Sequence, residues 1–251
     1  MYSQNSDTAG PFHAQIENSA AKGALLDNPI WNALGTAHQG LALVNRTARR
    51  YPPDTGPLAG TPGQSLDSYA ALRELAGPGG ILVLFLDQAP VLPAGWSLFR
   101  GGVLTQMICR HPNLVDTETL QNNAILRRLG KADVQAMVEL ATLTEPGPFR
   151  ERTIELGNFY GVFEDKRLLA MAGQRMRLPG FVEVSAVCTH LDARGRGYAG
   201  VLMSYVMRDI SGEGATPVLH AYADNPAVRL YEKLGFTHRR QFQLAVIKRD
   251  D

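Results

Sequence analysis

The stretch HLDARGRGYAG (190–200) lies between an apolar segment and a segment with helical periodicity, and its interpretation decides the fold. Its glycines spell Gly195-x-Gly197-x-x-Gly200, the pattern by which dinucleotide-binding proteins hold a pyrophosphate. The same letters also spell Arg194-x-x-Gly197-x-Ala199, a phosphate-binding loop of another enzyme class. The two frames predict different ligands, so the flanking sequence has to choose between them.

The dinucleotide frame requires a tight turn directly after a strand and a long α/β chain behind it. The predicted strand is FVEVSAVCT (181–189), so five residues separate it from Gly195. Only about fifty residues follow Gly200, too few for a doubly wound sheet and too few for a protein kinase. Asp224, after the next predicted strand, favours this frame. A third interpretation, in which the glycines and arginines only shape a helix entry, leaves the features described below unexplained.

The second frame predicts an anion site made by the main chain. The first N–H groups of a helix have no intrahelical acceptor, and the helix dipole favours negative charge there. Gly195 and Gly197 omit side chains where phosphates would approach, and Arg194 and Arg196 place positive charge nearby. Residues 198–210 behind the loop carry apolar side chains at helical spacing, as this frame requires.

Two motifs in this order resemble those of the GCN5-related N-acetyltransferases. Arg194-x-x-Gly197-x-Ala199 after the strand EVSAVCT is similar to their acetyl-CoA-binding motif, and NPAVRLYEKLGF (225–236) is similar to their second signature. The FR47-like branch, related to glycine N-acyltransferases, is most similar, through VSAVCTHLDARGRGYA and LHAYADNPAVRLYEKLGF. The resemblance covers about residues 120–251.

The resemblance implies a mixed, mostly antiparallel α/β sheet in which two parallel strands, here 182–189 and 217–223, splay apart. Coenzyme A would lie in the gap, with acetyl-CoA as cosubstrate and no metal. The family's asparagine lies seven residues before its tyrosine, whereas Asn225 lies six before Tyr231 and Asp224 takes the seventh position. The residues expected to contact the cosubstrate are Val187, Cys188 and Thr189 through their main chain, then Arg194, Gly195, Arg196, Gly197, Tyr198, Ala199 and Asn225.

For catalysis, the resemblance implies direct acyl transfer to a primary amine of a small molecule or amino acid. Tyr231 matches the tyrosine that protonates the leaving sulfur, and Glu183 matches the strand glutamate that acts as general base in several members. Cys188 has no adjacent histidine, so a covalent route through it is not expected. His220 shares a predicted strand face with Val218, either lining the acceptor pocket or buried as a core histidine. The alternative function is a non-catalytic acyl-CoA-binding sensor or interaction module.

Composition excludes several other classes. The net charge of +1 argues against a general nucleic-acid binder, and the longest apolar run, ILVLFL (81–86), is far shorter than a membrane span. Only two cysteines, Cys109 and Cys188, are present, so neither a disulfide framework nor a cysteine-rich metal site is possible. The polar N-terminus has no signal-peptide pattern, so we expect a cytoplasmic protein that is a monomer or homodimer.

The chain is long enough for two domains. We predict a flexible tail over 1–23, an N-terminal α/β domain over 24–118 and the acetyltransferase domain over 119–251. The N-terminal segment has strand–helix–strand content, which indicates a degenerate second copy of the same fold, expected to form one wall of the acceptor pocket. Within it, residues 91–110 are expected to hold further short strands.

Overall fold

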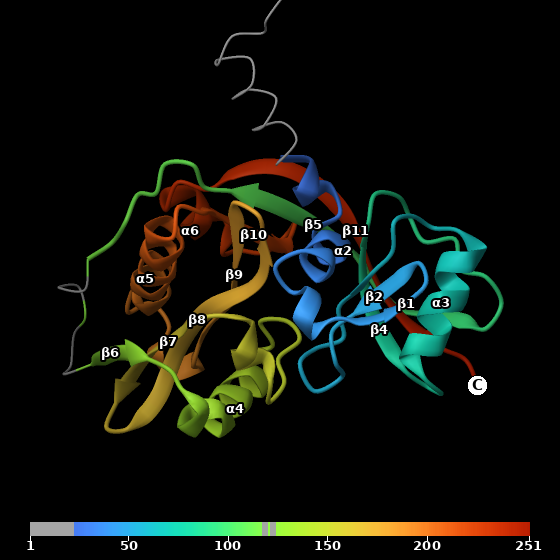
Figure 1. The fold of residues 1–251 in the computed structure, drawn as a ribbon. Helices are drawn as coiled ribbons and strands as arrows, with labels where there is room; N and C mark the ends of the chain where they lie inside the picture. The colour runs from blue at the N-terminus through green and yellow to red at the C-terminus, as the bar shows by residue number, and fades with distance from the viewer. Residues whose placement is uncertain (1–22, 117–119, 121–123) are drawn as a thin grey trace, which may run out of the picture.

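The computed structural model describes residues 23–116, 120 and 124–251, so the predicted tail over 1–23 lies, except for Gly23, outside the described residues. The chain forms an eight-stranded mixed sheet and a three-stranded antiparallel sheet, with helices packed against both (Figure 1). Among the described residues, no helix combines the length and the apolar character needed to cross a membrane.

The regular elements follow the predicted ones closely in the second half of the chain. The α-helices are α2 (Pro29–Gly35), α3 (Leu66–Ala76), α4 (Val134–Thr144), α5 (Tyr198–Gly212) and α6 (Val228–Lys233). The strands are β1 (Leu43–Asn45), β2 (Ala48–Arg50), β3 (Ala59–Gly60), β4 (Ile81–Leu86), β5 (Trp96–Ile108), β6 (Ile125–Arg128), β7 (Phe159–Glu164), β8 (Arg167–Leu178), β9 (Phe181–Thr189), β10 (Thr216–Tyr222) and β11 (Thr237–Arg249). The 3-10 helices are η1 (Leu25–Asp27), η2 (Gln39–Leu41), η4 (Lys131–Asp133), η5 (Thr153–Leu156) and η6 (Leu191–Ala193).

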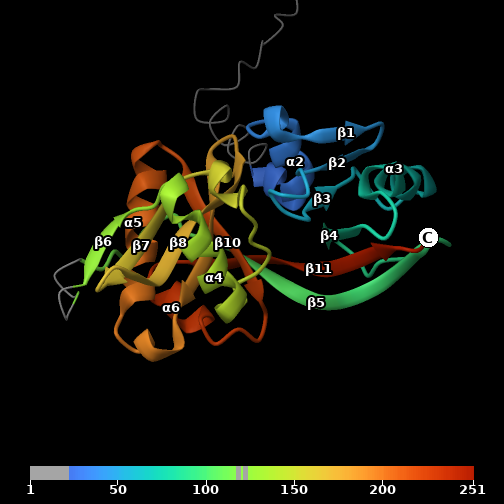
Figure 2. The same cartoon turned by 90° about the horizontal axis from the view of Figure 1, so that it is seen from below.

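The large sheet has the strand order β4-β11-β5-β10-β9-β8-β7-β6, so a strand from the first half of the chain lies inside it. The expectation of several short strands over 91–110 is wrong, because β5 is one strand of thirteen residues that pairs with both β10 and β11. Its glycines allow a close approach, since a Cβ at Gly102 would lie 2.9 Å from the ring of Tyr222. The long strands β5 and β11 run from one lobe of the molecule to the other (Figure 2).

The sheet is therefore continuous across the proposed domain boundary at residues 118 and 119, which we keep as a proposal together with the degenerate second copy. The first lobe consists of the small sheet β1-β2-β3 with α2 and α3 and ends in the edge strand β4. Buried side chains of α2, including Ile30 and Leu34, pack in one cluster with Met176 of β8 and Phe242 of β11. This packing covers the middle of the large sheet on one face.

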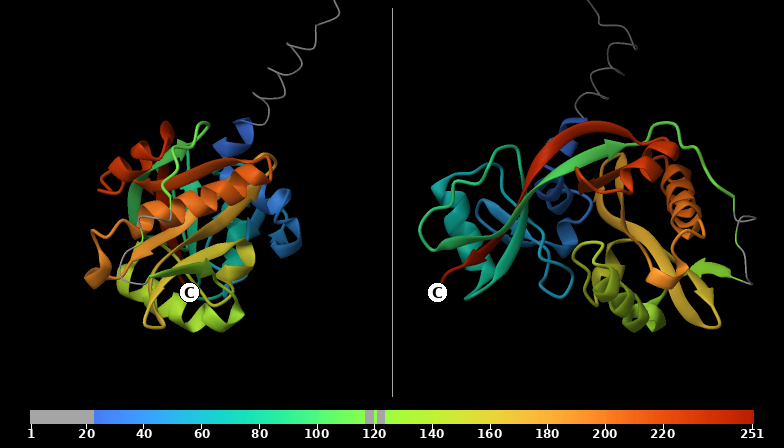
Figure 3. Two further views of the ribbon diagram at one scale, coloured as in Figure 1. Left: turned by 90° about the vertical axis from the view of Figure 1, so that its left-hand side faces the viewer. Right: turned by 180° about the vertical axis from the view of Figure 1, so that it is seen from behind.

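The two faces of the second lobe are covered by different helices (Figure 3). The apolar side of α5, including Leu202 and Val206, packs with Val182 and Val184 of β9. On the other face, Met137 and Leu140 of α4 pack with Ala186 and Cys188 of the same strand. In an uninterrupted strand Val182, Val184, Ala186 and Cys188 would share one face, whereas here Val182 and Val184 face α5 and Ala186 and Cys188 face α4.

The reversal has a local cause, a β-bulge at Ala186. This residue has φ +52°, and Ala186 and Val187 together stand opposite the single residue Ala172 of β8. An extra residue on one strand shifts the alternation by one position and bends the strand. Ala186 thus turns toward α4, whereas Val187 packs against the cluster beneath α5.

A buried histidine in the first lobe predicts an acid-sensitive fold. His38 Nδ1 lies 2.8 Å from the Tyr51 hydroxyl, and burial, together with the charge of Arg177, lowers the pKa of His38 to about 4. In the unfolded chain His38 is protonated as the pH falls below about 6.5, whereas in the folded chain it stays neutral until about pH 4. The free energy of unfolding is therefore unaffected by His38 above pH 6.5 and falls by up to about 3 kcal/mol as the pH drops toward 4.

Urea unfolding at pH 7 and pH 4.5 measures this loss. In His38→Gln the difference in unfolding free energy between the two pH values is expected to shrink by about 2 to 3 kcal/mol. An unchanged difference would show that His38 is not the group responsible. Glu183, whose pKa is lowered to about 2 mainly by Arg175 against the opposing effect of burial, loses its contribution only below pH 4.5, so the two effects are separable.

Candidate functional site

The parallel strands β9 and β10 pair over only part of their length. Their register runs from Thr216 opposite Phe181 to Val218 opposite Glu183 and stops there. Beyond this point β10 pairs only with β5, and β9 keeps only β8 as a neighbour. The strand edge that carries Val187, Cys188 and Thr189 therefore faces a gap, as the resemblance implied, and its free main-chain groups can bind an extended ligand.

The glycine loop meets α5 at the end of this gap. Gly195 and Gly197 both have φ +80°, a conformation that favours glycine, and Gly197 is the N-cap of α5. A Cβ built at either glycine would meet nothing within 4 Å. The amides at the start of α5 have no intrahelical acceptor, so this open space is lined by hydrogen-bond donors at the positive end of a fifteen-residue helix.

The two arginines of the loop are not equivalent. Arg196 donates to both carboxylate oxygens of Glu164 at 3.0 Å and to the Asp192 carbonyl at 2.9 Å, and the Tyr198 hydroxyl also donates to Glu164. Glu164 thereby ties the loop to the end of β7. Arg194 is exposed and has no polar partner among the described residues, so it is the arginine available to a ligand phosphate.

Tyr231 lies on α6 in the apolar cluster shared by β9, β10 and α5. Its side chain is 7% exposed and packs edge-on against Phe236. The hydroxyl has no hydrogen-bond partner among the described residues, and burial raises the pKa of the phenol. A protonated phenol without a hydrogen-bond partner among these residues is suited to donating a proton to a ligand.

Asn225 lies in the turn after β10 and shapes the start of α6. Its Oδ1 accepts a hydrogen bond from the Ala227 amide at 2.9 Å, and its carbonyl accepts from Val228 at 3.1 Å. The helix α6 begins only at Val228, because residues 225–227 form this turn. The side-chain amide nitrogen of Asn225 donates to no acceptor in the described part of the chain.

Glu183 belongs to a buried row of polar side chains that crosses the sheet, from Arg175 on β8 to Arg239 on β11. Glu183 accepts from Arg175 Nε at 2.7 Å and Nη2 at 2.6 Å, and from His220 Nδ1 at 2.8 Å. Both the Glu183 and the His220 side chains are 1% exposed. A carboxylate with these partners has a pKa of about 2, which does not favour the role of general base predicted for Glu183.

The row fixes the tautomer of His220. Gln106 Oε1 accepts from Arg239 at 2.7 Å, which turns the Gln106 amide nitrogen toward His220 Nε2 at 2.9 Å. Because the amide nitrogen donates, Nε2 accepts and Nδ1–H donates to Glu183. His220 is thus a core histidine with both nitrogens satisfied, which answers the question left by the sequence.

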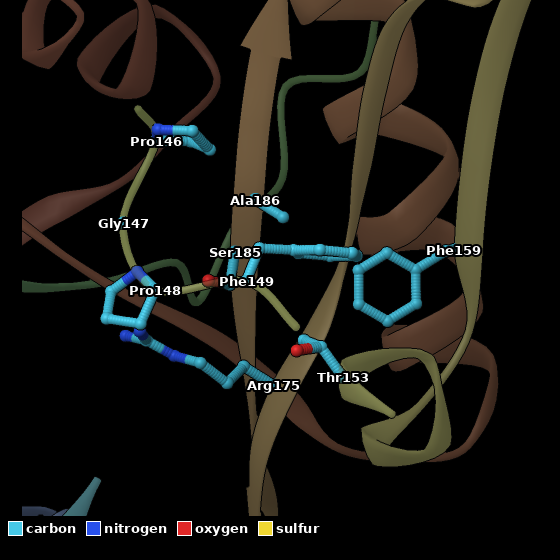
Figure 4. A pocket seen from close by; sticks show the side chains of 9 residues that line it. All are labelled: Pro146, Gly147, Pro148, Phe149, Thr153, Phe159, Arg175, Ser185 and Ala186. Atoms are coloured by element: carbon cyan, nitrogen blue, oxygen red, sulfur yellow. The ribbon is translucent and has the colours of Figure 1, made fainter. Parts of the chain in front are cut away.

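A small pocket lies in front of the bulge, between β9 and the loop after α4 (Figure 4). Arg175 and Ser185 contribute polar groups, and prolines and phenylalanines form most of the rest of the wall. None of the residues lining the pocket comes from the first lobe. That lobe instead braces the pocket wall, since Thr153 donates to the Thr55 carbonyl at 2.8 Å and Arg152 pairs with Asp54.

Three further features bear on the chemistry of the site: Cys188, His190 and the grouping of possible metal ligands. Cys188 is buried against α4, and burial raises the pKa of its thiol to about 11, so it carries no thiolate near neutral pH. His190, in the loop after β9, has a side chain only 13% exposed, and its Nδ1 accepts from the Asp192 amide. Within the described part of the chain, no three His, Cys, Asp or Glu side chains are grouped to hold a metal.

Comparisons with known proteins agree with this geometry. The model of the FR47-like protein family matches residues 159–244. A solved structure of a GNAT-family protein from Novosphingobium aromaticivorans, described as an acetyltransferase, is 38% identical with TM-score 0.82, over 90% of this chain and 99% of that one. The chain belongs to the GCN5-related N-acetyltransferase (GNAT) family. No curated protein matches the sequence significantly.

Two more distant GNAT structures support the fold alone. A GCN5-related N-acetyltransferase from Kribbella flavida has TM-score 0.59 at 15% identity, over 88% of this chain and 96% of that one. A related protein from Streptococcus suis has TM-score 0.56 at 15% identity, over 93% and 98%. Membership of the family shown by the 38% identical relative makes the chain an acyltransferase, and β9 and β10 are the splayed strands of its GNAT fold.

Three features of the candidate site were not predicted from the sequence. Arg175 pairs with Glu183, Glu164 clamps the loop, and the segment 146–149 covers the pocket. Arg175 left a signal, because an arginine in an otherwise buried strand needs an acidic partner. Glu164 left none, since the tip of a hairpin is ordinarily polar.

Proposed function

We propose that this acyltransferase uses acetyl-CoA to acetylate a primary amine of a small molecule or amino acid, by direct transfer in a ternary complex. The observation that carries the proposal is the gap between β9 and β10, which opens at Glu183 and leads to the amides at the start of α5. An extended ligand with a pyrophosphate at one end matches both parts of this site.

In the proposed complex the main chain of Val187, Cys188 and Thr189 binds the pantetheine arm as an added strand would. The pyrophosphate accepts from the amides of residues 194–199, and Arg194 adds a charge that no carboxylate of the described residues neutralises. The absence of a Cβ at Gly195 and Gly197 lets the phosphates approach the main chain. Asn225 offers its free amide donors from the far side of the gap.

The transfer itself needs an uncharged amine and a proton for the departing sulfur. The amine nitrogen forms a bond to the acetyl carbon, the carbon–sulfur bond breaks, the nitrogen loses a proton and the sulfur gains one. Tyr231 supplies the proton to sulfur, because its buried phenol stays protonated at neutral pH. We assign Glu183 to positioning Arg175 and His220, and the amine loses its proton to solvent.

Release of CoA thiol from acetyl-CoA, measured across a panel of amines, tests the proposal. We expect turnover on at least one primary amine, with the acetylated product visible by mass spectrometry. CoA binding without turnover on any amine would instead indicate the acyl-CoA sensor. Tight binding of NAD without binding of CoA would indicate that the loop is a dinucleotide-binding motif.

A further inference from the structure

The small pocket in front of Ala186 brings polar groups of β8 and β9 together with apolar side chains. It lies on the face of β9 opposite α5, where the bulge turns Ala186 toward α4. Much of its wall is apolar, and charge interactions are stronger beside apolar groups than in bulk water. The residues that matter here are Pro146, Pro148, Phe149, Phe159, Arg175 and Ser185.

Arg175 uses only part of its guanidinium within the protein. Nε and Nη2 form a bidentate pair with Glu183, while Nη1 has no acceptor among the described residues. The side chain is 12% exposed, and its guanidinium end points toward Pro148 at the pocket (Figure 4). A guanidinium has five N–H donors in a planar fork, so the pair with Glu183 leaves the Nη1 donors for a second acceptor.

The buried row makes this donor rigid. Glu183 is itself held by His220, and His220 by Gln106, so the plane of the Arg175 guanidinium is fixed before any ligand binds. Glu183 also divides its negative charge between Arg175 and His220. A preorganised donor that needs no reordering gains affinity for a planar acceptor such as a carboxylate.

A second donor lies in the same pocket on the neighbouring strand. The Ser185 hydroxyl has no hydrogen-bond partner among the described residues, and Ser185 comes directly before Ala186. No acidic side chain lines the pocket, so nothing there would attract a second ammonium group. The pocket thus combines unused hydrogen-bond donors with apolar walls.

We infer that the acceptor carries a carboxylate beside its amine, as an amino acid does. The carboxylate would accept hydrogen bonds from Arg175 Nη1 and the Ser185 hydroxyl, and its amine would lie at the bulge near the acetyl group. This inference rests on the proposed acetyl transfer and names the substrate class of that same site. Arg175 and Ser185 are then binding residues, and Glu183 is a positioning residue.

The test compares proteinogenic amino acids with their α-carboxamides, which keep the amine and remove the negative charge. For the best acceptor, kcat/KM of the natural chain is expected to be about 10- to 100-fold higher for the amino acid than for its carboxamide. In Arg175→Lys the ammonium can still pair with Glu183, but the second set of guanidinium donors is lost. The ratio of kcat/KM for the amino acid to that for its carboxamide should therefore fall to about threefold or less. The affinity of this variant for CoA should stay unchanged.

Arg177→Lys is the matched control, because Arg177 lies on the same strand, pairs with Glu213 and does not line the pocket. It should keep the full preference. If Arg175→Lys does not fold, Ser185→Ala replaces it and should lower the preference about three- to tenfold.

Equal kcat/KM for amino acids and carboxamides in the natural chain would overturn the inference and leave acetyl transfer intact. If no amine turns over, the proposed function fails instead. Calorimetric titration of the amino acid and carboxamide pairs into the protein–CoA complex then decides the inference alone, with preferential binding of the carboxylate supporting it and equal or absent binding overturning it.

Discussion

Gly197→Glu is expected to weaken CoA binding about 100-fold or more. Gly197 is the N-cap of α5, and its Cβ direction points into the open space that the pyrophosphate would fill. The substitution therefore blocks that space and places a negative charge against the phosphates. Calorimetric titration with CoA measures the loss of affinity.

A glutamate at φ +80° also strains the backbone by about 1 to 2 kcal/mol, so the strain needs its own control. Gly214→Glu supplies it, because Gly214 has φ +73° and open surroundings but lies at the other end of α5. This variant should lose similar stability and still bind CoA normally.

Gly200→Ala separates the two phosphate-loop frames. Gly200 lies inside α5, and a Cβ there would be 3.7 Å from Leu230 and 3.9 Å from Val115, which are ordinary contacts. Alanine favours a helix more than glycine does, so the variant should be at least as stable and bind CoA within about threefold. A loss of CoA affinity as large as that of Gly197→Glu would show that the glycine-x-glycine-x-x-glycine frame is the functional one.

Tyr231→Phe is expected to lower kcat about 100-fold or more while leaving CoA affinity unchanged. The hydroxyl has no partner in the described protein, so its removal orphans no buried group and keeps the packing against Phe236. What the variant loses is the proton for the departing sulfur. Steady-state thiol release with the best acceptor, together with CoA titration, measures both quantities.

Tyr205→Phe is the matched control for this prediction. Tyr205 lies on α5 in the same lobe, and the centroid of its ring lies 5.8 Å from that of Tyr160. It should keep full activity. A Tyr231→Phe enzyme with normal kcat would show that another group protonates the sulfur, whereas a matching loss in CoA affinity would indicate a binding role for the hydroxyl.

The sequence predicted those parts of the fold that are encoded locally. The strand over 181–189, the loop at 190–197 and the start of α5 at Tyr198 appear where periodicity and glycine spacing placed them. The loop conformation follows from residues within a few positions of each other, and Gly195 and Gly197 adopt the left-handed geometry that only glycine adopts readily.

The unpredicted features depend on contacts between distant residues. β5 pairs with β10 and β11, more than a hundred residues away, and its central glycines resemble turn signals until Tyr222 is packed against them. The bulge at Ala186 is invisible in an alternating pattern, because no residue type marks it. The pairing of Glu183 with Arg175 requires the register of β8 and β9, which shifts a second time at Arg175 and Met176, opposite Glu183.

A crystal structure of the protein with CoA tests the central claim most directly. We predict that the pyrophosphate lies within hydrogen-bond distance of the amides of residues 194–199, that the pantetheine arm runs along Val187–Thr189 in the gap between β9 and β10, and that the sulfur lies beside the Tyr231 hydroxyl. CoA bound elsewhere, or a pyrophosphate remote from Gly197, would contradict the account.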